Sequence, residues 1–132
     1  MSNAAATQRI AERFYELCSA GKFDDAMQEL YADDARHVEV MEMPGSPYKR
    51  ITAGKPELLR MSEHWNRTTT VHSSWVGRPL VNDDQFLIEF KMEVTASEGP
   101  MAGQRMPLAE HALYTVKNGR ISEARFFYSC EK

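Results

Sequence analysis

The sequence predicts an α+β domain with three helices on the concave face of a cone-shaped, curved and mostly antiparallel sheet. Two helical segments, a short strand and a third helix come first, and β-rich segments fill most of the second half of the chain. Helices separated in this way from a run of strands are typical of the α+β class. At this chain length the sheet has to curl if it is to enclose anything, so we expect a cone-like cavity.

Three segments have the apolar spacing of amphipathic helices. From Thr7 onward, apolar residues recur at helical intervals at Ile10, Phe14, Leu17 and Cys18. Gly21 stands where a C-cap glycine is expected, and a second apolar stripe follows at Phe23, Ala26, Met27, Leu30 and Tyr31. Pro56 suits the first position of a third helix, whose Leu58, Met61 and Trp65 share one side.

Alternating residues predict the strands. The first strand is expected at 37–43, with His37, Glu39 and Met41 on one face, although Val38 and Val40 would make an equally good buried pair. Residues 44–54 are rich in turn-forming residues and are expected to form the longest loop. Further strands are expected at 71–81, 85–95, 104–116 and 120–128.

The last two strands are expected to form a tight hairpin, because Asn118-Gly119 favours a type I′ turn. A two-residue loop pairs Lys117 with Arg120 and places His111 on the same face as Phe126 and Tyr128. We expect this face to be interior, since the opposite face carries three charged residues, Glu110, Glu123 and Arg125. A β-bulge within 106–116 would shift the register by one and turn Glu110 inward in place of His111.

Composition excludes several classes of protein. The chain has 132 residues, of which 42% are hydrophobic and 27% charged, and its net charge of −3 does not favour nucleic acid or an anionic membrane surface. No apolar run approaches the roughly 20 residues of a transmembrane helix. Two cysteines are too few for a disulfide framework. We therefore expect a single cytoplasmic domain over 7–130, with 1–6 as a disordered start that lacks the features of a signal peptide.

Four stretches together resemble a known family: 13–21 (RFYELCSAG), 30–35 (LYADDA), Gly54-Lys55 at the start of a helix, and 116–121 (VKNGRI). They are similar to the SnoaL-like family, which belongs to the superfamily of nuclear transport factor 2 and ketosteroid isomerase. The likeness covers roughly residues 7–130 and implies the cystatin-like, nuclear-transport-factor-2-like fold. The superfamily includes isomerases, cyclases, dehydratases, hydrolases and non-enzymatic binding modules, so the resemblance implies a fold more specifically than an activity.

The resemblance also implies roles for individual residues. Isomerases of this group have an aspartate base four residues after a Tyr-Ala-Asp-Asp-Ala run, and Glu39 occupies that place here. Their oxyanion tyrosine falls on Phe14, which has no hydroxyl, and their protonated aspartate falls near His111 or Ala112. Because that oxyanion hole needs hydroxyl and acid donors, we expect no useful steroid-isomerase activity.

The expected site combines a base with a hydrogen-bond donor. Glu39 is the candidate general base, its pKa raised by an apolar wall, and His111 is the candidate donor to a developing oxyanion. Residues expected to line the ligand site are Phe14, Tyr31, His37, Trp65, Phe90, Phe126 and Tyr128. The structural alternatives are a solvated edge carboxylate, a satisfied core histidine and aromatic residues that fill the core. No motif suggests a metal or a cofactor, and His64 and His72 follow no ligand spacing.

The sequence thus predicts a pocket for a small apolar or carbonyl-containing ligand, with acid–base catalysis of the isomerase, cyclase, dehydratase or hydrolase type on an apolar carbonyl or polyketide-like substrate. A non-catalytic ligand-binding or association module and a structural dimer with a filled core are the alternatives. We also expect a homodimer through the outer sheet face, where the predicted register places Tyr114, Val116, Ile121 and Phe127.

Overall fold

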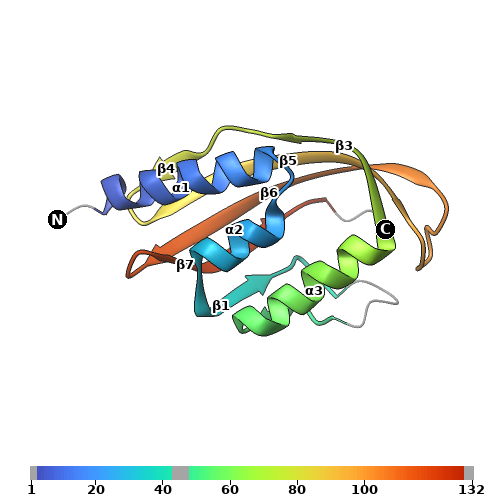
Figure 1. Ribbon diagram of the computed structural model, residues 1–132, viewed down its shortest axis with the longest axis horizontal. Helices are drawn as coiled ribbons and strands as arrows, with labels where there is room; N and C mark the ends of the chain where they lie inside the picture. The colour runs from blue at the N-terminus through green and yellow to red at the C-terminus, as the bar shows by residue number, and fades with distance from the viewer. Residues whose placement is uncertain (1–2, 43–47, 130–132) are drawn as a thin grey trace.

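The computed structural model describes residues 3–42 and 48–129, within which there are three helices and seven strands (Figure 1). The helices are α1 (Ala4–Ser19), α2 (Phe23–Leu30) and α3 (Lys55–Thr68). The strands are β1 (Tyr31–Val38), β2 (Ile51–Ala53), β3 (Thr69–Val76), β4 (Leu80–Asn82), β5 (Gln85–Ala96), β6 (Arg105–Lys117) and β7 (Arg120–Phe127). No helix among the described residues is both long enough and apolar enough to cross a membrane.

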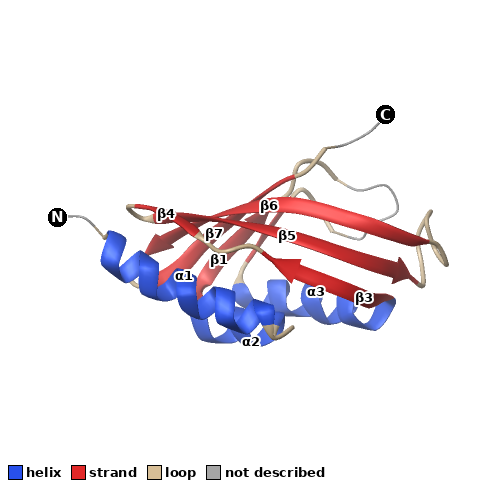
Figure 2. Ribbon diagram, turned by 90° about the horizontal axis from the view of Figure 1, so that it is seen from above, coloured by secondary structure: helices blue, strands red, loops and turns tan. Residues whose placement is uncertain are grey.

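The strands form one curved, unclosed sheet in the order β2-β1-β7-β6-β5-β3, with β4 paired to β5. All three helices lie against the same face of this sheet, and the other face is uncovered (Figure 2). The predicted α+β class and helix placement are confirmed. The sheet is mixed, because β1 runs parallel to β7 while the other neighbours are antiparallel.

The N-terminal half differs from the sequence prediction in its boundaries. Helix α1 starts at Ala4, so residues 4–6 are helical, and residues 1–2 of the predicted disordered start lie outside the described residues. Strand β1 starts at Tyr31 and ends at Val38, whereas the sequence predicted a strand at 37–43. A register shift between Tyr31 and Arg36 lets this strand pair with β7 and leaves the intervening aspartates exposed.

Two other segments contain more strands in the structure than the sequence predicts. Part of the predicted loop 44–54 forms β2, which pairs with β1, and residues 43–47 lie outside the described residues. The predicted strand 71–81 is divided into β3 and β4, with Gly77, Arg78 and Pro79 between them. Proline cannot donate a ladder hydrogen bond, which is consistent with the interruption there.

The β6–β7 hairpin has the predicted turn and an unpredicted bulge. Asn118 and Gly119 both have positive φ, and Lys117 pairs with Arg120 as expected. Val116 then pairs with Ile121, but Thr115 pairs with Glu123, so Ser122 is the extra residue. The bulge turns Ile121 and Ala124 to the same buried side.

This bulge reverses the prediction for the faces of β6. Tyr114 and Val116 are buried beneath the helices together with Ala112, so Glu110 shares the inner face and His111 lies on the outer one. The predicted interior position of His111 is therefore wrong. The predicted dimer surface is wrong for Tyr114, Val116 and Ile121 as well, and only Phe127 of that set is exposed.

An aromatic cluster fills the core beneath α1. Phe14, which is 3% exposed, packs on Tyr114 with ring centroids 4.6 Å apart, and Tyr114 stacks on Phe86 at 4.8 Å. Buried aromatic pairs of this kind contribute more than their area alone. The cluster fills the space between the sheet and α1, and the space beneath α2 and α3 is left for a cavity.

Candidate functional site

A cavity of about 990 Å³ lies between the sheet and helices α2 and α3. Eight of the nine predicted site residues line it, namely Phe14, Tyr31, His37, Glu39, Trp65, Phe90, Phe126 and Tyr128. His111 does not, because it projects from the outer face, where its side chain is half exposed and lies 3.8 Å from the Glu89 carboxylate. In its place the inner face of β6 supplies Glu110.

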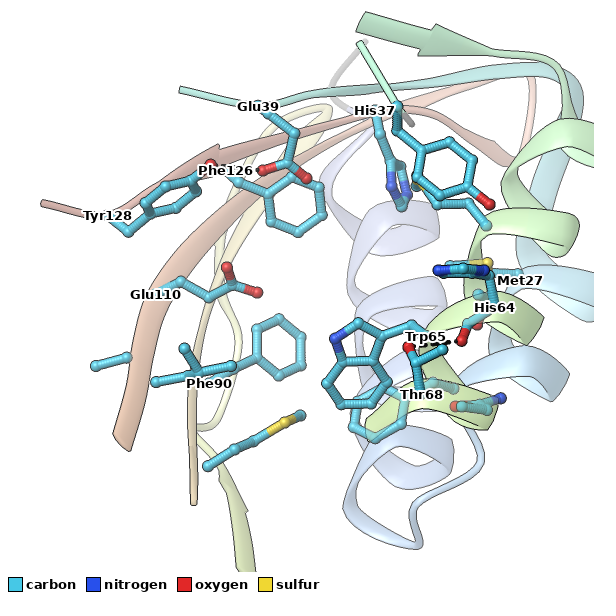
Figure 3. Close-up of a pocket in the computed structure, with 18 of the residues that line it drawn as sticks. Met27, His37, Glu39, His64, Trp65, Thr68, Phe90, Glu110, Phe126 and Tyr128 are labelled. Carbon is cyan, nitrogen blue, oxygen red and sulfur yellow. Dashed lines mark hydrogen bonds between the residues drawn. The ribbon is translucent and has the colours of Figure 1, made fainter. Parts of the chain in front are cut away.

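Two carboxyl groups reach the cavity from different parts of the fold. Glu39 follows the last residue of β1, and its backbone N–H donates to the carbonyl oxygen of Arg50 at 2.8 Å. Glu110 pairs across the ladder with Phe90, which shares its inward direction. Figure 3 shows both carboxyl groups directed into the same space, with the Phe126 ring between the strands that carry them. The site therefore contains a pair of carboxyl groups rather than the predicted carboxylate and imidazole.

The two carboxyl groups have different surroundings. Burial raises the pKa of Glu39, while a hydrogen bond from the Tyr128 hydroxyl to its Oε2 at 3.0 Å acts in the opposite direction by stabilising the ionised form. Burial and the nearby charge of Glu39 together raise the pKa of Glu110 to about 7. The Tyr128 hydrogen bond therefore favours the ionised form of Glu39, while Glu110 is the carboxyl group that retains a proton in a large share of molecules at neutral pH.

A neutral histidine lies beside this pair. The His37 ring is 5% exposed, its Nε2 is 2.7 Å from the Tyr31 hydroxyl oxygen, and its centroid is 5.0 Å from that of Phe126. Burial lowers the pKa of His37 to about 4. The imidazole is therefore uncharged at neutral pH and can both donate and accept a hydrogen bond.

Aromatic side chains make up the walls. Trp65 on α3 lies across the cavity from Glu110, and Phe90 lies on the sheet side between them (Figure 3). The ring of Phe23 on α2 packs against that of Phe90, with ring centroids 6.2 Å apart. These surfaces suit a flat, apolar molecule, and the carboxyl groups would face its polar atoms.

Polar groups occur again where α3 meets the β5–β6 turn. His64 Nε2 lies 2.8 Å from Glu98 Oε1, and both residues line the cavity. Asp24 of α2 accepts hydrogen bonds from Ser62 and Asn66 of α3. These contacts join α2, α3 and the β5–β6 turn around one end of the cavity. Among residues 3–42 and 48–129, no group of three or more His, Cys, Asp or Glu side chains is placed to hold a metal ion.

The role of Glu110 was missed because the sequence alone did not reveal the bulge at Ser122. A usable signal came from β5, whose inner residues Phe86 and Phe90 were clear from the alternation. In the observed β5–β6 ladder these residues pair with Tyr114 and Glu110. Had that register been predicted, it would have turned Glu110 inward.

Comparison with known families identifies the chain. A family model described as a SnoaL-like domain matches residues 5–128. The chain belongs to the SnoaL-like family. This confirms the resemblance that the sequence motifs indicated. No curated protein matches the chain.

Solved structures support the same assignment. A protein from Mesorhizobium loti, provisionally named a SnoaL-like polyketide cyclase with carbohydrate phosphatase as a second description, is 39% identical with a TM-score of 0.82. The match covers 91% of this SnoaL-like chain and 97% of that one. A provisionally named polyketide cyclase from Xanthomonas campestris is 19% identical, with a TM-score of 0.69 and coverage of 97% and 93%.

A provisionally named isomerase from Bacillus subtilis is 14% identical, with a TM-score of 0.71 and coverage of 98% and 90%. At such identities, the Xanthomonas and Bacillus proteins share the fold of this SnoaL-like chain, and their names carry no assignment of activity.

Proposed function

We propose that this SnoaL-like protein is an enzyme that catalyses proton transfer at an apolar carbonyl compound, of the isomerase or cyclase type. The observation that carries the proposal is the pair of Glu39 and Glu110 in one cavity. Burial raises the pKa of both carboxyl groups, but the Tyr128 hydrogen bond partly offsets this at Glu39, whereas the charge of Glu39 adds to it at Glu110. Such unequal surroundings are a basis for assigning a base and an acid.

In the proposed reaction, the Glu39 carboxylate removes a proton from the carbon next to the substrate carbonyl. The protonated Glu110 donates a hydrogen bond to the carbonyl oxygen, where negative charge develops. The resulting enolate keeps its hydrogen bond to Glu110. In the isomerisation of a β,γ-unsaturated ketone, Glu39 returns the proton to the γ-carbon and the double bond moves into conjugation. In a cyclisation, the enolate carbon attacks a second carbonyl group in the same molecule, and the alkoxide that forms takes the proton from Glu39. Both outcomes use one base and one donor.

The expected substrate is a carbonyl compound of polyketide type. A cavity of about 990 Å³ has room for several fused rings, and its aromatic walls suit flat molecules. The names of the Mesorhizobium and Xanthomonas proteins are consistent with this substrate class. The second description of the Mesorhizobium protein is a poor guide for this chain, because the charge of Glu39 would repel a phosphate ester.

A non-catalytic ligand-binding module is the second candidate, favoured by the predominantly aromatic walls of the cavity. Two partly buried carboxyl groups count against it, since an apolar binder gains nothing from the cost of their desolvation. A structural dimer with a filled core is disfavoured by the cavity itself.

Exchange of carbon-bound protons tests the proposal without a known substrate. The protein is incubated in D₂O with a panel of aryl and cyclic ketones, and deuterium at the carbon next to the carbonyl is measured by mass spectrometry. We expect protein-dependent exchange that falls by about 10²-fold or more in Glu39→Gln, because the base is removed. Glu89→Gln on the outer face is the matched control and should exchange like the wild type. Exchange that persists in Glu39→Gln, or none above buffer for any ketone, would contradict the proposal.

We also propose a homodimer through the uncovered sheet face and, from composition alone, a cytoplasmic location. On that face Trp75 is 51% exposed and Phe127 is 47% exposed, with Glu89, Lys91 and His111 among them. A mixture of aromatic and oppositely charged groups suits a self-complementary contact with a second copy. Light scattering should give about twice the chain mass of 15.1 kDa, and Trp75→Glu should give the mass of one chain. A wild-type mass of one chain would refute the dimer.

A further inference from the structure

We propose that the cavity selects uncharged ligands and rejects molecules that bring a carboxylate or phosphate to the Glu39–Glu110 pair. The substrate would then be a neutral ketone or ester rather than the corresponding free acid. This inference rests on the proposed function for the choice of site, and it names the substrate class more narrowly.

The lining of the cavity contains few charged side chains. Four lining side chains are of the Asp, Glu, Lys or Arg type: Glu39, Lys49, Glu98 and Glu110. Glu98 is paired with His64 at 2.8 Å, at the end of the cavity where α3 meets the β5–β6 turn. Lys49 is an exposed residue. Within the described part of the chain, the carboxyl pair therefore has no buried ammonium or guanidinium group beside it in the lining.

Hydrogen bonds and a retained proton accommodate the Glu39–Glu110 pair without a buried cation. Glu39 accepts a hydrogen bond from the Tyr128 hydroxyl at 3.0 Å, which spreads its charge. Glu110 can keep its proton, and the neighbouring His37 ring is buried against Tyr31 and Phe126. Protons and neutral donors thus compensate the two acids, and a ligand cation is not needed to balance them.

This arrangement favours neutral ligands over anionic ones. A neutral carbonyl oxygen can accept a hydrogen bond from Glu110, so donor and acceptor are matched. A ligand carboxylate would lose its hydration and face the Glu39 charge at a few ångströms. Repulsion at such distances in a partly buried site corresponds to a loss of affinity of about 10- to 100-fold. A protonated amine would be attracted by Glu39, but it would leave the Glu110 proton without an acceptor.

Three naphthalenes of similar size test this selectivity: 2-acetylnaphthalene, 2-naphthoate and 2-(aminomethyl)naphthalene. Binding is followed at neutral pH by two-dimensional NMR of the indole N–H groups. The chain has two tryptophans, of which Trp65 lines the cavity and Trp75 lies on the outer face. Shifts at Trp65 and not at Trp75 therefore report binding in the cavity.

We expect the ketone to bind in the cavity and 2-naphthoate to bind at least about tenfold more weakly. In the double variant Glu39→Gln/Glu110→Gln, which has no ionisable carboxyl group at the pair, affinity for 2-naphthoate should rise by about tenfold while that for the ketone changes little. Glu89→Gln should leave all three affinities unchanged. The proposal is overturned by 2-naphthoate binding within twofold of the ketone, by the amine binding tightest, or by no ketone binding up to about 1 mM. If selectivity holds but no ketone shows deuterium exchange, the proposed catalysis fails and the selectivity stands as that of a binding protein.

Discussion

Replacing Glu110 by glutamine is expected to stabilise the protein at neutral and alkaline pH. The fold holds this carboxyl group among apolar side chains and near the charge of Glu39, and both factors penalise the ionised form. Glutamine has nearly the same shape and no charge. The substitution therefore removes the penalty and retains the volume of the side chain.

The size and sign of the effect follow from the pKa. Burial and Glu39 raise the pKa of Glu110 from an ordinary 4.5 to about 7 in the fold. Between these two pH values the folded state binds more protons than the unfolded state, so stability falls as pH rises. The total loss is about 3 kcal/mol, complete once pH has risen through about 7. Below 4.5 the carboxyl group is neutral in both states and contributes no further change.

Urea unfolding from about pH 4 to pH 8.5 measures the difference between wild type and Glu110→Gln. The difference should be near zero at the acid end and approach 3 kcal/mol in favour of the variant at the alkaline end, or about 10 °C in melting temperature. Other groups such as His37 titrate in both proteins, so their contribution cancels when the two free energies of unfolding are subtracted. Glu89→Gln, on the neighbouring strand but the outer face, should show no comparable trend. A flat difference curve for Glu110→Gln would refute the argument that Glu110 is buried with a raised pKa.

Three further predictions concern other residues of the cavity and the core. The wild type should lose about 3 kcal/mol of stability as pH falls from 6.5 through about 4, since the buried His37 imidazole resists protonation, and His37→Asn should not show this loss. Urea unfolding at several pH values measures the loss, and the same acid dependence in both proteins would contradict the prediction. Tyr128→Phe should raise the pKa of Glu39 further, so that the rate of deuterium exchange begins to fall at a higher pH when the solution is acidified. An unchanged pH dependence of the exchange rate would count against the hydrogen bond. Phe14→Ala should cost about 3–5 kcal/mol in urea unfolding, because the ring is buried against two aromatic residues; a cost below about 1 kcal/mol would exclude that packing.

The parts of the fold that the sequence predicted well are those determined locally. Helical spacing identified all three helices, and Asn118-Gly119 predicted the β6–β7 turn, since positive φ at both residues favours this dipeptide. Motif similarity added the family, which the match over residues 5–128 confirms. Eight of the nine predicted site residues line the cavity. The periodicity was correct for Phe14, Trp65 and Phe90, whereas Tyr31 was expected on a helix and instead begins β1.

The errors arose where pairing with distant strands decides the structure. Ser122 has no sequence feature that marks it as a bulge. Without a bulge, Ala124 and Phe126 would pair on the face of β6 that carries His111, whereas the observed pairing puts them on the face that carries Glu110. Similarly, β1 begins at Tyr31 because it pairs in parallel with β7, a long-range contact that local propensity does not predict.

A titration of the glutamate carboxyl groups by NMR, in isotope-labelled protein, tests the central claim most directly. If Glu39 and Glu110 share one cavity as an acid–base pair, Glu110 should titrate near 7 in the wild type. Its pKa should fall in Glu39→Gln, where the neighbouring charge is removed. A Glu110 resonance that titrates near the ordinary value of 4.5 and does not respond to Glu39→Gln would contradict the claim.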